Sequence, residues 1–144
     1  NLTPACESLS HELALVDIPV AEHVRREVVD TVKAHLDAVR AFELAAGVRG
    51  QPLFGESAML NLIRFEPGAT VPLHSHPHEQ LGLVLEGMQA LVVDGVAHEL
   101  KPFEAYVLPG GVEHSAYAGS EGSLVLDVFA PVREDYLERW EAPS

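Results

Sequence analysis

GATVPLHSHPHEQLGLVLEG, residues 68–87, sets two histidines one residue apart in a segment that otherwise has the composition of β-structure. Successive side chains of a strand point to opposite faces, so residues two apart share a face. His74 and His76 can therefore direct both imidazoles toward one point. A third histidine, His114, follows a Pro109-Gly110-Gly111 turn of the kind that reverses a strand. These three histidines form a candidate metal site.

Short apolar runs separated by turn residues surround this stretch. Asp94-Gly95, between two such runs, is a strong signal for a two-residue hairpin. The expected strands lie around residues 53–54, 59–65, 80–86, 90–93, 96–100, 105–108 and 124–130. Short strands at regular spacing, with no repeat or linker between them, predict a β-sandwich or barrel.

The spacing of the histidines and glycines resembles the cupin signature. That signature is a glycine, five residues, His-x-His, a ligand position, six residues and a second glycine. The matching residues are Gly68, His74, His76, Gln80 and Gly87. A second cupin motif is similar to the segment that ends at His114, although Phe103 stands where glycine is usual. The resemblance implies an all-β fold, the double-stranded β-helix or jelly-roll barrel of cupins.

The expected organisation is an N-terminal extension at residues 1–47, a cupin barrel at 48–132 and a tail at 133–144. Val24, Val28, Val32 and Leu36 recur at the spacing of an amphipathic helix, which we expect at about residues 20–41. Its apolar stripe packs either on the outside of the barrel or against a second subunit. We favour the second subunit, because small cupins are commonly homodimers.

Gln80 stands where cupins commonly have a carboxylate ligand. Strand alternation places Gln80 on the face of the histidines and Glu79 on the other face, unless the preceding loop breaks the alternation. The expected ligands are His74, His76, Gln80 and His114, with Glu79 as an alternative. Such ligands suit one divalent transition ion, namely zinc, nickel, iron, manganese or copper. Without a carboxylate ligand, we expect Lewis-acid chemistry more than oxygen activation. The alternative is that these are ordinary polar residues at a barrel mouth.

Asp127 interrupts the last predicted strand, in phase with Val125 and Phe129. A carboxylate on the inner face of a barrel must be paired, protonated or functional, because burying an isolated charge is costly. Asp127 is therefore a candidate general acid or base. The alternatives are a salt bridge with Arg64 or Arg133, or an outward position.

HSHPHEQ and the tail DVFAPVREDY together resemble pectin-degradation-type cupins, which open 4,5-unsaturated uronates. By matching motif, the resemblance implies Asp127 and Arg133 as catalytic residues and Phe129 as a substrate-binding residue. Arg64 and His78 are further candidates for substrate binding, with solvent exposure as the alternative for both. Arg133 can instead form a surface ion pair, and Phe129 can instead belong to the core.

The expected function is metal-dependent isomerisation or ring opening of a small sugar acid, from an unsaturated uronate to a keto-deoxyuronate. One alternative is a metal-dependent dioxygenase or lyase acting on a small organic acid. Another is a cupin that binds a ligand without turnover.

The 144 residues include 22 acidic and 9 basic side chains, for a formal net charge of −13. Such a charge repels nucleic acids and anionic membranes, so a small molecule is the expected partner. No stretch approaches the ~20 apolar residues that a membrane-spanning helix needs. The single cysteine, Cys6, fits a reducing compartment, and we expect a cytoplasmic protein.

Overall fold

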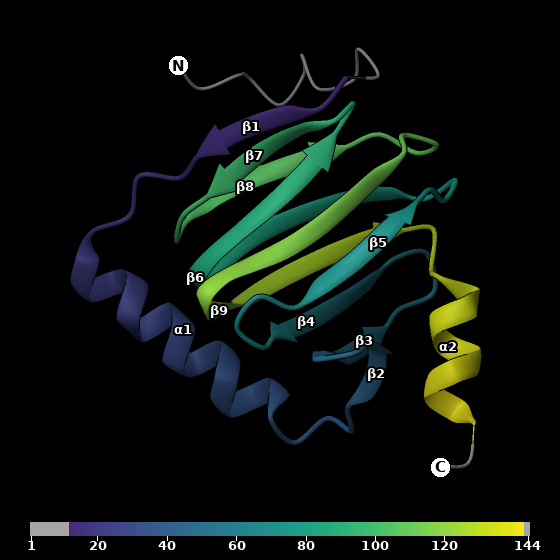
Figure 1. Ribbon diagram of the computed structural model, residues 1–144. Helices are drawn as coiled ribbons and strands as arrows, with labels where there is room; N and C mark the ends of the chain where they lie inside the picture. Colours follow the sequence, from purple (N-terminus) through teal and green to yellow (C-terminus); the bar gives the residue numbers. More distant parts are fainter. Residues whose placement is uncertain (1–11, 143–144) are drawn as a thin grey trace.

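A computed structural model describes residues 12–142, and Cys6 lies outside them. The described chain is an antiparallel β-structure of nine strands with two helices, which confirms the predicted jelly-roll class (Figure 1). The elements are β1 (Ala14–Asp17), α1 (Glu22–Leu36), β2 (Phe42–Ala45), β3 (Val48–Phe54), β4 (Met59–Phe65), β5 (Thr70–His74), β6 (Glu79–Val93), β7 (Val96–Leu100), β8 (Glu104–Leu108), β9 (His114–Ala130) and α2 (Glu134–Glu141). Within residues 12–142, no helix is long and apolar enough to cross a membrane.

Two long central strands, β6 and β9, join the two parts of the barrel because each has different neighbours at its two ends. The first part of β6 pairs with β8 and its second part with β7, while β9 pairs first with β5 and then with β4. Both strands change register near Gly87, which has φ +75°. A Cβ atom at Gly87 would lie 2.1 Å from the carbonyl oxygen of Gly122, so only glycine fits this bend.

Helix α1 lies along the outer face of the sheet (Figure 1). Val29 is buried in a cluster with four apolar side chains from that sheet and the β7–β8 connection: Leu62, Leu85, Phe103 and Leu124. Val28, Val32 and Leu36 pack against the same cluster. Val28, Val32 and Leu36 thus pack on the outside of the barrel, the first of the two expected alternatives, while Val24 is 36% exposed. Packing of the helix against a second subunit stays a prediction. The helix is also shorter than the expected span of 20–41.

Helix α2 stands at one end of the barrel and has no buried residue of its own (Figure 1). It is held by its aromatic side chains. The Tyr136 ring contacts Phe42 and Phe129 edge-on, and the Trp140 ring lies 5.5 Å from that of Phe54. The backbone after β9 is therefore fixed beside the interior of the barrel.

The strands that are bounded by clear turn residues were predicted best from the sequence. The bounds of β4 and β7 agree with the predicted 59–65 and 96–100. Asp94 and Gly95 both have positive φ angles in the β6–β7 turn, as a two-residue hairpin requires. Strands β1, β2 and β5 were missed. Two predicted strands merge into β6, and β9 begins at His114 instead of 124.

Phe103, which replaces the usual cupin glycine, has a φ of +67° in the connection before β8. This left-handed conformation costs a residue with a Cβ atom roughly 1–2 kcal/mol. The ring nevertheless is only 3% exposed and packs beneath α1, with the Arg25 guanidinium 5.3 Å from its centroid. Packing of the aromatic ring thus outweighs the backbone strain.

Two truncations of Phe103 separate packing from strain. We expect Phe103→Ala to lower the free energy of unfolding by about 3–5 kcal/mol through loss of the ring. Phe103→Gly should lose about 1 kcal/mol less, because glycine adopts a positive φ without strain. Chemical denaturation measures both values. An alanine variant that is as stable as the glycine variant would contradict this account of Phe103.

Candidate metal centre

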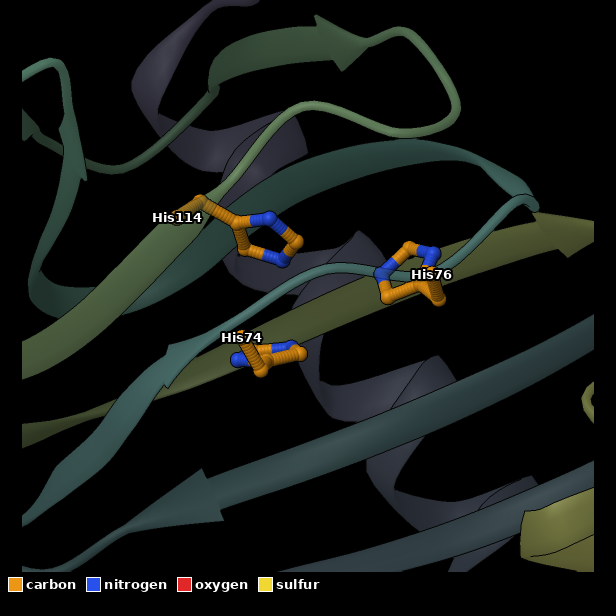
Figure 2. A group of neighbouring side chains, drawn as sticks. All are labelled: His74, His76 and His114. Carbon is orange, nitrogen blue, oxygen red and sulfur yellow. The ribbon is translucent and has the colours of Figure 1, made fainter.

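Three histidines from different segments meet at one end of the barrel. His74 is the last residue of β5, His76 lies in the loop that follows, and His114 is the first residue of β9. His74 and His114 are paired across β5 and β9. One ring nitrogen from each of the three lies within 4.8 Å of the others, and Figure 2 shows the rings gathered around a common space. Nitrogens bound to one zinc at about 2.0–2.1 Å are roughly 3.4 Å apart, so small ring rotations would suffice.

The backbone orients each imidazole through its Nδ1 atom. This atom lies 2.8 Å from the Pro72 carbonyl oxygen in His74 and 2.8 Å from the Val112 oxygen in His114. In His76 it lies 3.0 Å from the oxygen of His78. An Nδ1–H that donates to a carbonyl leaves the Nε2 lone pair free for a metal.

His76 also faces a second oxygen, and this contact tests whether a cation fits. Its Nε2 atom lies 3.0 Å from Oε1 of Gln80. Burial first, and then the charge of Arg133, lower the pKa of His76 to about 4, so the ring is neutral at pH 7. A neutral imidazole has one N–H for two oxygen partners. A cation between Nε2 and Oε1 would satisfy both lone pairs, so these residues fit a metal ion.

Asp127 continues this polar group into the barrel. It is 4% exposed, and its Oδ1 accepts a 2.8 Å hydrogen bond from the Tyr106 hydroxyl. Its Oδ2 accepts a 3.2 Å bond from Nε2 of Gln80, which also donates to Tyr106 at 2.7 Å. A buried carboxylate is thereby connected to the side chain that faces the imidazoles.

A cavity of about 200 Å³ opens beside these groups. His74, Gln80, His114 and Asp127 all line it. Apolar side chains such as Ile63, Val125 and Phe129 form much of the remaining wall. The partly apolar space suits a small ligand that presents oxygen atoms to the polar cluster.

Comparison with known proteins identifies the family. Residues 61–129 match the family model described as Cupin domain. The pectin degradation protein KdgF of Dickeya dadantii is 30% identical over 97 residues, which are 66% of this chain and 88% of that protein. This chain belongs to the cupins.

Two further proteins are similar to this cupin. The dimethylsulfoniopropionate lyase DddW of Ruegeria pomeroyi is 33% identical over 91 residues, 63% of this chain. The match spans only 60% of the length of DddW. The solved structure of KdgF from a Halomonas species is 29% identical, with a TM-score of 0.63, over 67% of this chain and 90% of that chain.

Arg133 lines the cupin cavity. It forms a bidentate ion pair with Asp135, with N–O distances of 2.9 and 2.7 Å. An ion pair was the alternative to a catalytic role for Arg133. The Arg133 side chain is nevertheless only 8% exposed. Its Nη1 atom is buried without a hydrogen-bond partner among the described residues. A donor thus remains for an anionic ligand, and it belongs to a side chain that lines the cavity.

Phe129 contributes to both the core and the cavity of this cupin. It is 1% exposed, and its ring lies edge-on to those of His76 and Tyr136. Phe129 thus belongs to the core and also lines the cavity, and its role in substrate binding stays a prediction.

The structure does not bring Arg64 to the cavity. Arg64 shares a face of β4 with Leu62, and that face is the outer one, beneath α1. Its guanidinium instead pairs with Asp37 at 2.6 Å. Arg64 therefore lies outside the cavity that the histidines line, and its role in substrate binding stays a prediction.

The other loop residues flank the site. Glu79 is exposed and absent from the histidine cluster, so the alternation that sends it away from Gln80 holds. The ring of His78 lies 5.6 Å from that of His76, and its buried Nδ1 has no hydrogen-bond partner in the described chain. His78 is not among the residues that line the cavity.

Burial raises the pKa of Asp127 to about 7, although hydrogen bonds from Tyr106 and Gln80 oppose the shift. Burial, followed by the charge of Asp127, raises the pKa of Tyr106 well above its ordinary value. Tyr106 thus keeps its proton, while Asp127 can gain or lose one near neutral pH. A carboxyl group with that pKa suits general acid–base chemistry.

Proposed function

We propose that this cupin binds one divalent transition metal through His74, His76, Gln80 and His114 and opens the ring of a 4,5-unsaturated uronate, giving a linear keto-deoxyuronate. The observation that carries the proposal is Asp127. A buried carboxyl group with a pKa near 7 lines the same cavity as two of the imidazoles and is hydrogen-bonded to Gln80. The similarity to KdgF supports the substrate class.

The proposed reaction is an isomerisation. The bond between C1 and the ring oxygen breaks, and the C1 hydroxyl loses its proton as the aldehyde forms. The released enol at C5 gains a proton at C4 and becomes a ketone. No atom is added and no oxygen is consumed, so a group that accepts and returns one proton is sufficient.

Three residues have proposed roles in this reaction. Asp127 takes the proton from the C1 hydroxyl and delivers a proton to C4. Arg133 binds the substrate carboxylate through the donor that Asp135 leaves free. Phe129 holds the ring against the cavity wall, and His78 supports the loop that carries His76. A bound divalent ion would supply Lewis-acid polarisation of a substrate oxygen.

The partners, the location and the oligomeric state that we propose are inferred from the sequence. We propose a small-molecule substrate without nucleic-acid or membrane partners, in keeping with the net charge of −13. We also propose a cytoplasmic homodimer. The similarity to DddW makes a lyase the second candidate, since a cavity carboxyl group can equally remove a proton in an elimination.

Product analysis tests the reaction class. Metal-loaded protein incubated with 4,5-unsaturated galacturonate should abolish the enol absorbance and give a product of unchanged mass. Oxygen uptake should be nil. A product whose mass has increased by oxygen atoms taken from O₂ would favour a dioxygenase. Cleavage of dimethylsulfoniopropionate with no effect on the uronate would favour a lyase. Ligand binding without any turnover would leave a binding protein.

A further inference from the structure

Tyr106 reaches the polar group of the cavity from two strands away. It lies on β8 opposite Gly82 of β6, and Gly82 in turn lies opposite Asp127 of β9. Neighbouring strands are about 4.8 Å apart, so the Tyr106 ring must cross β6 to reach Asp127. A Cβ atom at Gly82 would lie 2.4 Å from the ring. Because Gly82 has no side chain, the Tyr106 hydroxyl can reach Asp127.

The hydroxyl of Tyr106 has one proton, and its use fixes the orientation of the Gln80 amide. The proton is donated to Oδ1 of Asp127. The lone pairs of the hydroxyl then require a donor from Gln80, 2.7 Å away, and only the amide nitrogen can provide it. Oδ2 of Asp127 requires a donor from the same direction. The amide oxygen is consequently left on the opposite side, 3.0 Å from Nε2 of His76.

We propose that Tyr106, seated over Gly82, is a positioning residue that orients the Gln80 amide so that its oxygen, not its nitrogen, faces the metal. The inference rests on the ligand set of the proposed function and not on the reaction. Without the hydroxyl, only the longer 3.2 Å bond to Oδ2 of Asp127 is left to hold the amide nitrogen, so Gln80 rotates more easily by half a turn and then directs its NH₂ group at His76. An amide nitrogen that carries two protons has no lone pair to give to a metal, so the fourth ligand would be lost.

Replacing Tyr106 with phenylalanine tests this role with Co²⁺ as the probe and the full chain as the sample. Phenylalanine keeps the ring that packs against Val84, Leu91, Leu100 and Val125. We expect Tyr106→Phe to weaken Co²⁺ binding roughly 10- to 100-fold, the usual effect of removing a group that orients a ligand. The visible absorption spectrum of the Co²⁺ complex should also change, because an oxygen ligand is lost. A loss of packing alone would not alter that spectrum.

Two further variants make the test specific. Tyr117→Phe removes a hydroxyl from a strand residue that does not line the cavity, and it should leave both Co²⁺ affinity and spectrum unchanged. Gly82→Ala keeps the Tyr106, Gln80 and Asp127 side chains but displaces the tyrosine ring. It should reproduce the spectral change of Tyr106→Phe.

The outcomes separate this inference from the proposed function. Tight Co²⁺ binding by the unaltered protein with the same affinity and spectrum in Tyr106→Phe would overturn the role of Tyr106 and leave the ligand set intact. Failure of the unaltered protein to bind Co²⁺ would overturn the ligand set and the role of Tyr106 together. A weaker, spectrally altered complex in both Tyr106→Phe and Gly82→Ala would support the inference.

Discussion

Asp127→Asn should lower kcat for uronate ring opening by roughly 10²- to 10⁴-fold, the range that a general acid or base contributes. Asparagine has nearly the same shape as aspartate but cannot take up or release the proton. The expected metal ligands are unchanged, so the variant should still bind one ion when metal is in excess. Steady-state kinetics with saturating metal, together with the metal content of the same sample, measure both quantities.

The control for this variant is Asp30→Asn, which changes an exposed carboxylate on α1. It should retain full activity. Full activity of metal-loaded Asp127→Asn would remove Asp127 from the mechanism.

The pH dependence of unfolding checks the state of Asp127 without any substrate. Its pKa is about 7 in the folded protein and near the ordinary 3.8 in the unfolded chain. Between these values the folded state holds a proton that the unfolded state has released. The metal-free protein should thus lose stability as the pH rises from about 4 to 7, by at most on the order of 4 kcal/mol from this group. Asp127→Asn should lack this contribution.

His76→Ala should abolish metal binding and turnover together. His76 is 7% exposed, and its ring is the one that faces both the common space of the histidines and Oε1 of Gln80. Removing a group that only orients a ligand costs 10- to 100-fold in metal affinity, so loss of a ligand itself should cost more than about 100-fold. Titration with Zn²⁺ against a competing chelator measures this loss.

His98→Ala provides the matched control. His98 lies on β7, outside the cavity lining, and its loss should change neither affinity nor turnover. Equal metal affinity in His76→Ala and the unaltered protein would show that the three histidines do not form the metal site.

Local spacing in the sequence contained most of the information about the histidines. The His-x-His motif and the glycines around it predict the end of a strand and a following loop. These bring His74 and His76 to one end of the barrel. Convergence of His114 followed from the second turn motif. Strands β1 and β2 were missed because each is only four residues long. Strand β5 was missed because Pro72 stands in its middle, where proline argues against a strand.

Alternation along a strand assigns residues to a face but does not say which face is inside. Arg64 shares a face with Leu62, and that face is covered by α1. Tyr106 was not predicted as a site residue for a related reason, because its partners lie on two other strands. Gly82 was the available signal: a glycine within an apolar strand often marks a place where another group approaches closely. Only the strand register connects it to Tyr106 and Asp127.

The most direct test of the proposed metal-dependent ring opening is the metal content of the purified protein, measured together with turnover of 4,5-unsaturated galacturonate before and after chelation. We predict about one divalent transition ion per chain, loss of turnover on chelation and recovery when the metal is restored. Turnover that persists in metal-free protein would contradict the account, as would a metal-loaded protein that leaves the uronate unchanged.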